Sequence, residues 1–131
     1  MEKEFVPYDI ALAMKELGFD DKSLAMYTDD SGSIRLLFDG SISGSNINVW
    51  KSKKMTSAPL YQQAFRWFRE EYNLWVEISK PFTWLLTISD KKQNKRISLE
   101  DYNNYVEPKT YEEAQEDCLR KLIEIVKENL D

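Results

Sequence analysis

The chain has 131 residues, of which 42% are hydrophobic and 31% charged, with four glycines, four prolines and one cysteine. This composition is typical of one soluble domain, 1–131, that buries about two thirds of its unfolded surface. The chain contains no histidine, which removes the commonest general base and the most versatile metal ligand. The single cysteine, Cys118, excludes an intramolecular disulfide and a zinc cage. The composition therefore favours a non-enzymatic binding protein without a cofactor or metal.

The net charge of −5 is unevenly distributed. Residues 110–131 contain seven acids and three bases, which gives −4, so the remainder is nearly neutral. A general basic surface for nucleic acid is therefore absent. The N-terminal residues lack a basic and then apolar leader, and no apolar run approaches the roughly 18 residues of a membrane span. We expect a cytoplasmic protein without a membrane partner.

Residues 7–17 have the apolar spacing of a short, mostly buried helix. Ile10, Met14 and Leu17 recur at three- and four-residue intervals after a proline. Gly18 follows directly and supplies a C-terminal stop. The first predicted element is therefore a helix that ends at Gly18.

Residues 59–72 predict a second helix with an unusually aromatic face. Its apolar arc carries Tyr61, Phe65, Trp67, Phe68 and Tyr72. Because these side chains have helical spacing, packing in the core is favoured over stacking on nucleic-acid bases. Trp67 lies at the edge of the arc and is expected to be partly exposed.

Residues 110–130 predict a closing helix. Thr110 and Glu113 have the spacing of a capping box, in which each side chain accepts a hydrogen bond from the other residue's backbone N–H. Cys118 falls on the apolar arc of this helix, so a structural role is favoured over a nucleophile that no histidine can activate.

Residues 24–38 alternate between apolar and polar positions around the turn sequence Asp30-Ser31-Gly32. A three-residue loop with glycine last is typical of a hairpin built on a type I turn and a bulge. The register that this loop sets places six residues on one face: Leu24, Met26, Thr28, Ile34, Leu36 and Phe38.

Residues 74–88 predict a second hairpin with Lys80-Pro81-Phe82 as its loop. A shorter turn would mix apolar and polar side chains on both faces. The preferred register places Leu74, Val76, Ile78, Trp84, Leu86 and Ile88 on one face.

Together the elements predict an α+β fold of order αββαββα. Two helix–hairpin units, 7–38 and 59–88, share a pattern and form one antiparallel sheet of at least four strands. Helices pack on the apolar face of this sheet, and the helix 110–130 closes the chain. The connections 39–56 and 89–109 leave open one further strand each, at 46–50 and 96–99.

The opposite face of the predicted sheet is too apolar to be simply hydrated. It carries four large or apolar residues that a partner molecule would contact: Tyr27, Leu37, Trp75 and Leu85. Either the closing helix covers this face or another protein does, including a second copy of the chain.

Basic residues in the two connections offer an alternative, nucleic-acid surface. It consists of Trp50, Lys51, Lys53, Lys54, Lys91, Lys92, Lys95 and Arg96. Lysines beside an aromatic side chain suit a phosphate backbone with stacked bases. Short lysine runs in polar loops are more often only solvated surface.

Three segments together resemble a group of small uncharacterised proteins encoded by phages and mobile elements: FVPYDIALAMKELGFDD, APLYQQAFRWFREEYNLWVEI and TYEEAQEDCLRKLIEIVKENL. The resemblance covers most of the chain and departs in the connections 39–56 and 89–109. It implies an accessory protein of phage or mobile-element origin, located in the host cytoplasm or associated with the virion. It brings no established activity or site, so we expect a protein-interaction module whose partner is a host protein, a phage protein or a second copy.

Overall fold

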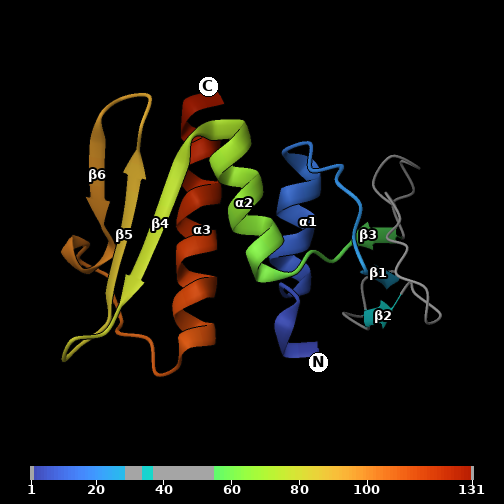
Figure 1. The fold of residues 1–131 in the computed structure, drawn as a ribbon, viewed down its shortest axis with the longest axis horizontal. Helices are drawn as coiled ribbons and strands as arrows, with labels where there is room; N and C mark the ends of the chain where they lie inside the picture. Colours follow the sequence, from blue (N-terminus) through green and yellow to red (C-terminus); the bar gives the residue numbers. More distant parts are fainter. Residues whose placement is uncertain (1, 29–33, 37–54, 131) are drawn as a thin grey trace. The chain divides into compact units, whose positions relative to one another are not determined.

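The computed structural model describes residues 2–28, 34–36 and 55–130, and it confirms an α+β fold that ends in a C-terminal helix (Figure 1). In chain order the elements are η1 (Glu2–Glu4), α1 (Tyr8–Glu16), β1 (Ala25–Thr28), β2 (Ile34–Leu36), β3 (Met55–Ser57), α2 (Tyr61–Tyr72), β4 (Leu74–Ser79), β5 (Leu85–Asp90), β6 (Lys95–Ser98), η4 (Leu99–Asp101) and α3 (Tyr111–Leu130). The chain divides into two compact units, 1–64 and 65–131, with the boundary inside α2.

The strands of the described residues form two antiparallel sheets instead of the single predicted sheet. Their orders are β2-β1-β3 in the first unit and β4-β5-β6 in the second. Each hairpin acquires its own third strand from the connection that follows it, so the central strands β1 and β5 are paired on both sides. Strand β6 confirms the strand expected near 96–99, whereas β3 was not predicted and the expected strand 46–50 lies outside the described residues.

In the first unit, α1 ends as its sequence predicts. Gly18 has a φ of +102°, and its N–H donates to the carbonyl of Lys15 at 3.0 Å. The N–H of the buried Phe19 donates to the carbonyl of Met14 at 2.9 Å. This pair of bonds is the Schellman arrangement, which needs a left-handed residue after the helix and explains why a glycine stands there.

The predicted register of the first hairpin is wrong by one residue. Tyr27 pairs with Ile34 and Ala25 with Leu36, so these residues share a face, and Met26 lies on the other. Ala25, Met26 and Tyr27 are all buried. Because the strand is buried on both faces, alternation of apolar and polar residues does not fix its register, and the register predicted from that pattern is therefore wrong.

In the second unit the predicted faces are correct although the loop is longer. Ile78 pairs with Leu86 and Ser79 with Leu85, so residues 80–84 form the loop. The shift relative to the predicted pairing of Ile78 with Trp84 is two residues, and an even shift keeps every side chain on its face.

The aromatic half of α2 belongs to the core of the second unit. Trp67 is only 5% exposed, contrary to prediction, because its ring packs edge-on against Phe68 at 5.0 Å and Tyr72 at 5.5 Å. These pairs combine area burial with a favourable edge-to-face geometry. The aromatic arc is therefore structural.

The start of α3 confirms half of the predicted capping box. Thr110 Oγ1 accepts a hydrogen bond from the N–H of Glu113 at 3.1 Å. The carboxylate of Glu113 accepts from the N–H of Lys109 at 2.7 Å, one residue before the expected donor. Cys118 is fully buried, as predicted.

Candidate functional site

The sheet β4-β5-β6 has one face buried by α3 and one face open to solvent. Leu74, Leu86 and Ile88 point to the same side of the sheet and are buried. Helix α3 contacts β4 and β5, and Leu74 lines a cavity together with Val126 of that helix. The last helix therefore covers this inner face and leaves the outer face uncovered.

Two of the predicted partner residues, Trp75 and Leu85, lie on the outer face and are 48% and 39% exposed. Between them Glu77 faces Thr87 across the strands. Glu77 also forms an ion pair with Arg96 of β6, at 3.7 Å. This polar row separates the two apolar side chains, so the outer face does not form the continuous apolar surface that the sequence suggests.

The other two predicted partner residues do not contribute to an exposed surface in the described part of the chain. Tyr27 is buried, contrary to prediction, and its hydroxyl donates to the carbonyl of Val6 at 2.6 Å. Its ring packs edge-on against Tyr8 at 5.4 Å. Leu37 lies outside the described residues.

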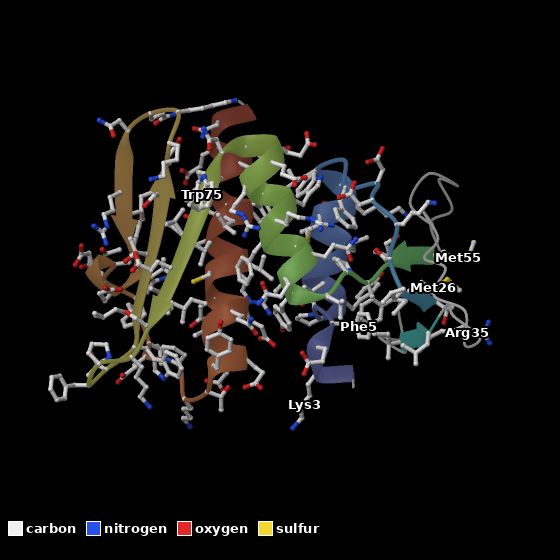
Figure 2. The ribbon with its side chains drawn as sticks, in the orientation of Figure 1. Lys3, Phe5, Met26, Arg35, Met55 and Trp75 are labelled. Carbon is white, nitrogen blue, oxygen red and sulfur yellow. The ribbon has the colours of Figure 1, made fainter. Side chains whose placement is uncertain are left out.

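Trp75 occupies the corner where α2 passes into β4 (Figure 2). Its indole N–H donates to the side-chain oxygen of Asn73 at 3.1 Å. The guanidinium of Arg69, in the last turn of α2, lies 5.5 Å from the centre of the ring. Trp75 thus has polar and cationic partners inside its own unit, which gives it a structural role despite its exposure.

Further exposed apolar side chains, including the two most exposed ones, belong to segments at the opposite end of the same sheet. This surface, which we name the apolar tip, consists of Phe82, Leu85, Val106 and Tyr111. Phe82 is 94% exposed and Val106 79%. Figure 1 shows the β4–β5 loop and the segment leading into α3 at the same end of this unit. Single apolar residues are normal on a surface, whereas several of them at one end of a unit make that end a candidate interaction site.

Specific contacts hold the apolar tip together. The N–H of Trp84 donates to Glu107 Oε1 at 3.1 Å, which ties the hairpin loop to the segment before α3. The rings of Trp84 and Tyr111 lie 6.1 Å apart. The ammonium of Lys80 lies 5.0 Å from the centre of the Trp84 ring. Phe82 therefore projects from a loop whose last residue, Trp84, is held by contacts with Lys80, Glu107 and Tyr111.

Of the apolar tip, only Leu85 was predicted from the sequence; the other three residues were missed because loops were expected to be polar and apolar helix positions to be buried. Phe82 falls in the predicted hairpin loop, and Tyr111 falls in the first turn of the predicted helix 110–130. A phenylalanine directly after Pro81, in a loop where small polar residues usually stand, was the available signal.

The basic surface predicted for nucleic acid is partly described. Lys91 and Lys92 are exposed on the turn between β5 and β6, and Lys95 and Arg96 are exposed at the start of β6. Asp90 holds this turn, because its carboxylate accepts hydrogen bonds from the N–H groups of Lys92 at 3.0 Å and Gln93 at 3.1 Å. Four members of the predicted set, Trp50, Lys51, Lys53 and Lys54, lie outside the described residues.

The chemistry of the described residues offers no activated nucleophile at Cys118. Burial raises the pKa of its thiol to about 12, with smaller contributions from Asp117 and Glu100. Within the described ranges, no group of three His, Cys, Asp or Glu residues is arranged to hold a metal ion. The helices described there include none with an apolar stretch long enough to span a bilayer.

Comparison with known proteins adds no relative: no family model, curated protein or solved structure matches the chain.

Proposed function

We propose that the protein is a non-enzymatic protein-interaction module that contacts its partner through the apolar tip. The observation that carries this proposal is the 94% exposure of Phe82 at the end of a braced hairpin. The loop that carries Phe82 is anchored by contacts of Trp84, so its backbone has less conformational freedom to lose on binding. Phe82 is the kind of anchor that fills an apolar pocket on a partner.

The size of the expected contribution follows from the exposed area of Phe82. A phenylalanine buries about 200 Å² when it is fully enclosed, which at about 25 cal/mol per Å² sets an upper limit near 5 kcal/mol. Ordering and imperfect packing reduce this value, and interface anchors typically contribute about 2 kcal/mol, a factor of about 30 in affinity. Phe82→Ala should therefore weaken partner binding by about this factor. It should leave folding unchanged, since the side chain is 94% exposed.

Position-specific photo-crosslinking tests the proposal. A benzophenone amino acid at Phe82 or Val106 should capture a discrete protein partner in cells, whereas the same probe at the exposed Arg66 of α2 should not. Binding of the purified partner should then weaken with Phe82→Ala. Capture that is equal at positions 82 and 66, or absent at 82, would refute the assignment of the apolar tip.

Sedimentation over a hundredfold range of concentration identifies the partner class. A monomer at all concentrations, together with capture at position 82, points to a different protein, whereas a dimer that Phe82→Ala dissociates points to a second copy. The phage or mobile-element origin implied by the sequence resemblance makes a host protein the first partner to test.

A nucleic-acid-binding function is the second candidate, and the outer face of the sheet favours it. Trp75 and Arg96 both pair with Ser89 of β5, so an aromatic ring and a guanidinium lie in one row across the sheet. Exposed lysines of the β5–β6 turn adjoin this row. Stacking on an aromatic ring and charge contacts to phosphates are the two components of single-strand binding.

Salt dependence distinguishes this candidate. If four phosphates are contacted, affinity for a single-stranded oligonucleotide should fall about 50-fold between 50 and 200 mM salt. Replacing Lys91, Lys92 and Lys95 with glutamine should reduce both the affinity and this slope, whereas Lys80→Gln at the far end of the hairpin should not. Absence of binding at 50 mM salt, or a salt dependence of the affinity that the triple variant does not alter, would reject the nucleic-acid-binding function.

A further inference from the structure

The sheet β4-β5-β6 has two edge strands, β4 and β6, and they differ in how well they resist pairing with another chain (Figure 1). Strand β6 is four residues long and begins with the exposed Lys95 and Arg96. A short length and basic side chains are common means of preventing an edge strand from pairing. Strand β4 is six residues long, contains no lysine, arginine, proline or glycine, and has Glu77 as its single charged residue. The edge of β4 therefore suits a further strand better than the edge of β6 does.

The register assigns the backbone groups that β4 directs away from β5. The N–H of Lys91 donates to the carbonyl of Asn73 at 3.1 Å, so these two residues form a hydrogen-bonded pair of the ladder. Hydrogen-bonded pairs alternate along an antiparallel ladder, so Trp75 also bonds to β5, whereas Val76 and Ile78 point their N–H and C=O groups outward. Within the described residues, no backbone hydrogen bond joins these outward groups to another element.

The side chains of the same two residues leave the inner face of the sheet incompletely covered at this edge. Val76 pairs with Ile88, and Ile78 pairs with Leu86. Ile88 and Leu86 on the central strand are fully buried, whereas Val76 and Ile78 are only half-buried. A strand added at this edge would enclose both side chains and would bond to the outward backbone groups. These are the two contributions that β-strand addition combines.

The sequence of β4 makes a second copy of the same strand a complementary occupant of this edge. Because Val76 directs its N–H and C=O groups outward, a two-fold axis at Val76 lets the two copies of this residue exchange both hydrogen bonds. The same register places Leu74 opposite Ile78 of the second copy, so apolar side chains meet on the inner face. A two-fold axis at Glu77 would instead place two like charges opposite each other, which is unfavourable.

Charge complementarity supports the same register on the outer face. There Trp75 lies opposite Glu77 of the second copy. The guanidinium of Arg69 lies 5.5 Å from the centre of the Trp75 ring, so the carboxylate of the second copy approaches a positive charge. The ion pair of Glu77 inside its own chain, with Arg96 at 3.7 Å, is exposed and therefore weak. The two-fold axis supplies the contact between carboxylate and guanidinium twice.

We propose that two copies of the chain associate through β4, which joins their three-stranded sheets into one continuous antiparallel sheet. The contact between two edges of this length is smaller than a standard interface of about 1,600 Å². The dimer should therefore be weak and reversible, with a dissociation constant in the micromolar range. The edge does not include Phe82, so this association does not depend on the function proposed for the apolar tip.

Amide hydrogen exchange of the ¹⁵N-labelled full chain tests the edge directly, because the proposed hydrogen bonds use the N–H groups of Val76 and Ile78. Their exchange should slow about threefold between about 50 μM and 1 mM chain, since the fraction of monomer falls. The N–H groups of Arg96 and Ser98 point outward from the β6 edge and are internal controls. Their exchange rates should be equal at both concentrations.

Two proline variants, one on each edge, make the assignment specific. A proline removes an N–H donor, but it leaves the ladder to β5 intact where that N–H points outward. The wild-type chain should change from monomer to dimer in sedimentation over a hundredfold range of concentration, and Val76→Pro should remain a monomer throughout. Arg96→Pro is the matched change on the β6 edge and should dimerise like the wild type, and so should Phe82→Ala. A dispersed spectrum shows that each variant is folded.

Four results would overturn the proposal. They are a wild-type chain that sediments as a monomer at every concentration, exchange at Val76 and Ile78 that does not depend on concentration, equal effects of Val76→Pro and Arg96→Pro, and a dimer that Phe82→Ala dissociates but Val76→Pro does not. The last result would assign the contact to the apolar tip. The exchange measurement needs no variant, so it decides the proposal even if Val76→Pro fails to fold.

Discussion

Asn73 is the single residue between α2 and β4, and its backbone lies in the left-handed region with a φ of +56°. Its N–H donates to the carbonyl of Arg69 at 3.0 Å, which closes the end of the helix. Its carbonyl accepts from the N–H of Lys91 at 3.1 Å, which ties this junction to the start of the β5–β6 turn. We therefore expect Asn73 to control how the helix passes into the sheet.

Replacing Asn73 with alanine or with glycine should separate backbone strain from side-chain loss. A residue with a Cβ loses about 1–2 kcal/mol in the left-handed region, and asparagine tolerates it better than alanine does. Both variants lose the acceptor for the Trp75 indole N–H, an exposed bond that contributes a few tenths of a kcal/mol. Glycine has no strain but a larger unfolded-state entropy. We expect Asn73→Ala to lower the free energy of unfolding by about 1–1.5 kcal/mol and Asn73→Gly to change it by less than about 0.5 kcal/mol.

Urea unfolding monitored by circular dichroism measures both values under one set of conditions. Asn103→Ala serves as the matched control, because Asn103 is exposed and does not have a positive φ. Equal destabilisation by alanine and glycine at position 73 would show that the side-chain hydrogen bond, not the backbone conformation, determines the effect. A loss on Asn103→Ala as large as that on Asn73→Ala would refute the reasoning altogether.

Three further predictions concern the same unit. Thr110→Ala should destabilise the chain by about 1 kcal/mol in urea unfolding and Thr110→Ser hardly at all, because only the hydroxyl caps the N–H of Glu113. Asp90→Ala should lower the free energy of unfolding in urea by about 2 kcal/mol, and Asp90→Asn should lower it clearly less, because asparagine keeps an acceptor for the N–H groups of Lys92 and Gln93. Equal losses of stability in the two variants would contradict this role of Asp90. Cys118, with its pKa raised to about 12 from a reference of 9, should react with Ellman's reagent at pH 8 about 1000-fold more slowly in the native chain than in 6 M guanidinium; rates within tenfold of each other would contradict its burial.

Helix limits could be predicted from the sequence because their signals are local. The stop at Gly18 depends on one residue's ability to adopt a positive φ, and the start at Thr110 depends on a side chain three residues from its donor. Both contacts form within a single turn, so no distant element alters them.

Strand pairing could be predicted only where apolar and polar residues alternate along the strand. The hairpin of β4 and β5 has one buried face, and its faces followed from the sequence even though the loop proved longer. The first three residues of β1 are buried on both faces, so its register depends on long-range contacts such as the hydrogen bond from Tyr27 to Val6. Strand β3 was missed for a related reason, because it is a short strand whose residues carry no period-two pattern.

The exposed aromatic residues of the second unit differ in the contacts that they make within the chain. This difference decides which of them is the better candidate for binding a partner. Trp75 was one of the four partner residues predicted from the sequence, yet its indole N–H donates to Asn73 and its ring lies against Arg69 at the junction of α2 and β4. Phe82 stabilises nothing that folding requires, because 94% of its surface faces solvent. Its loop is nevertheless braced by Trp84, through a hydrogen bond to Glu107 and a ring contact with Tyr111. A side chain that breaks the rule for loop residues, in a loop anchored by specific contacts, is better explained by binding than by folding. Mutations at Trp75 should therefore affect stability before function, and mutations at Phe82 should affect function alone.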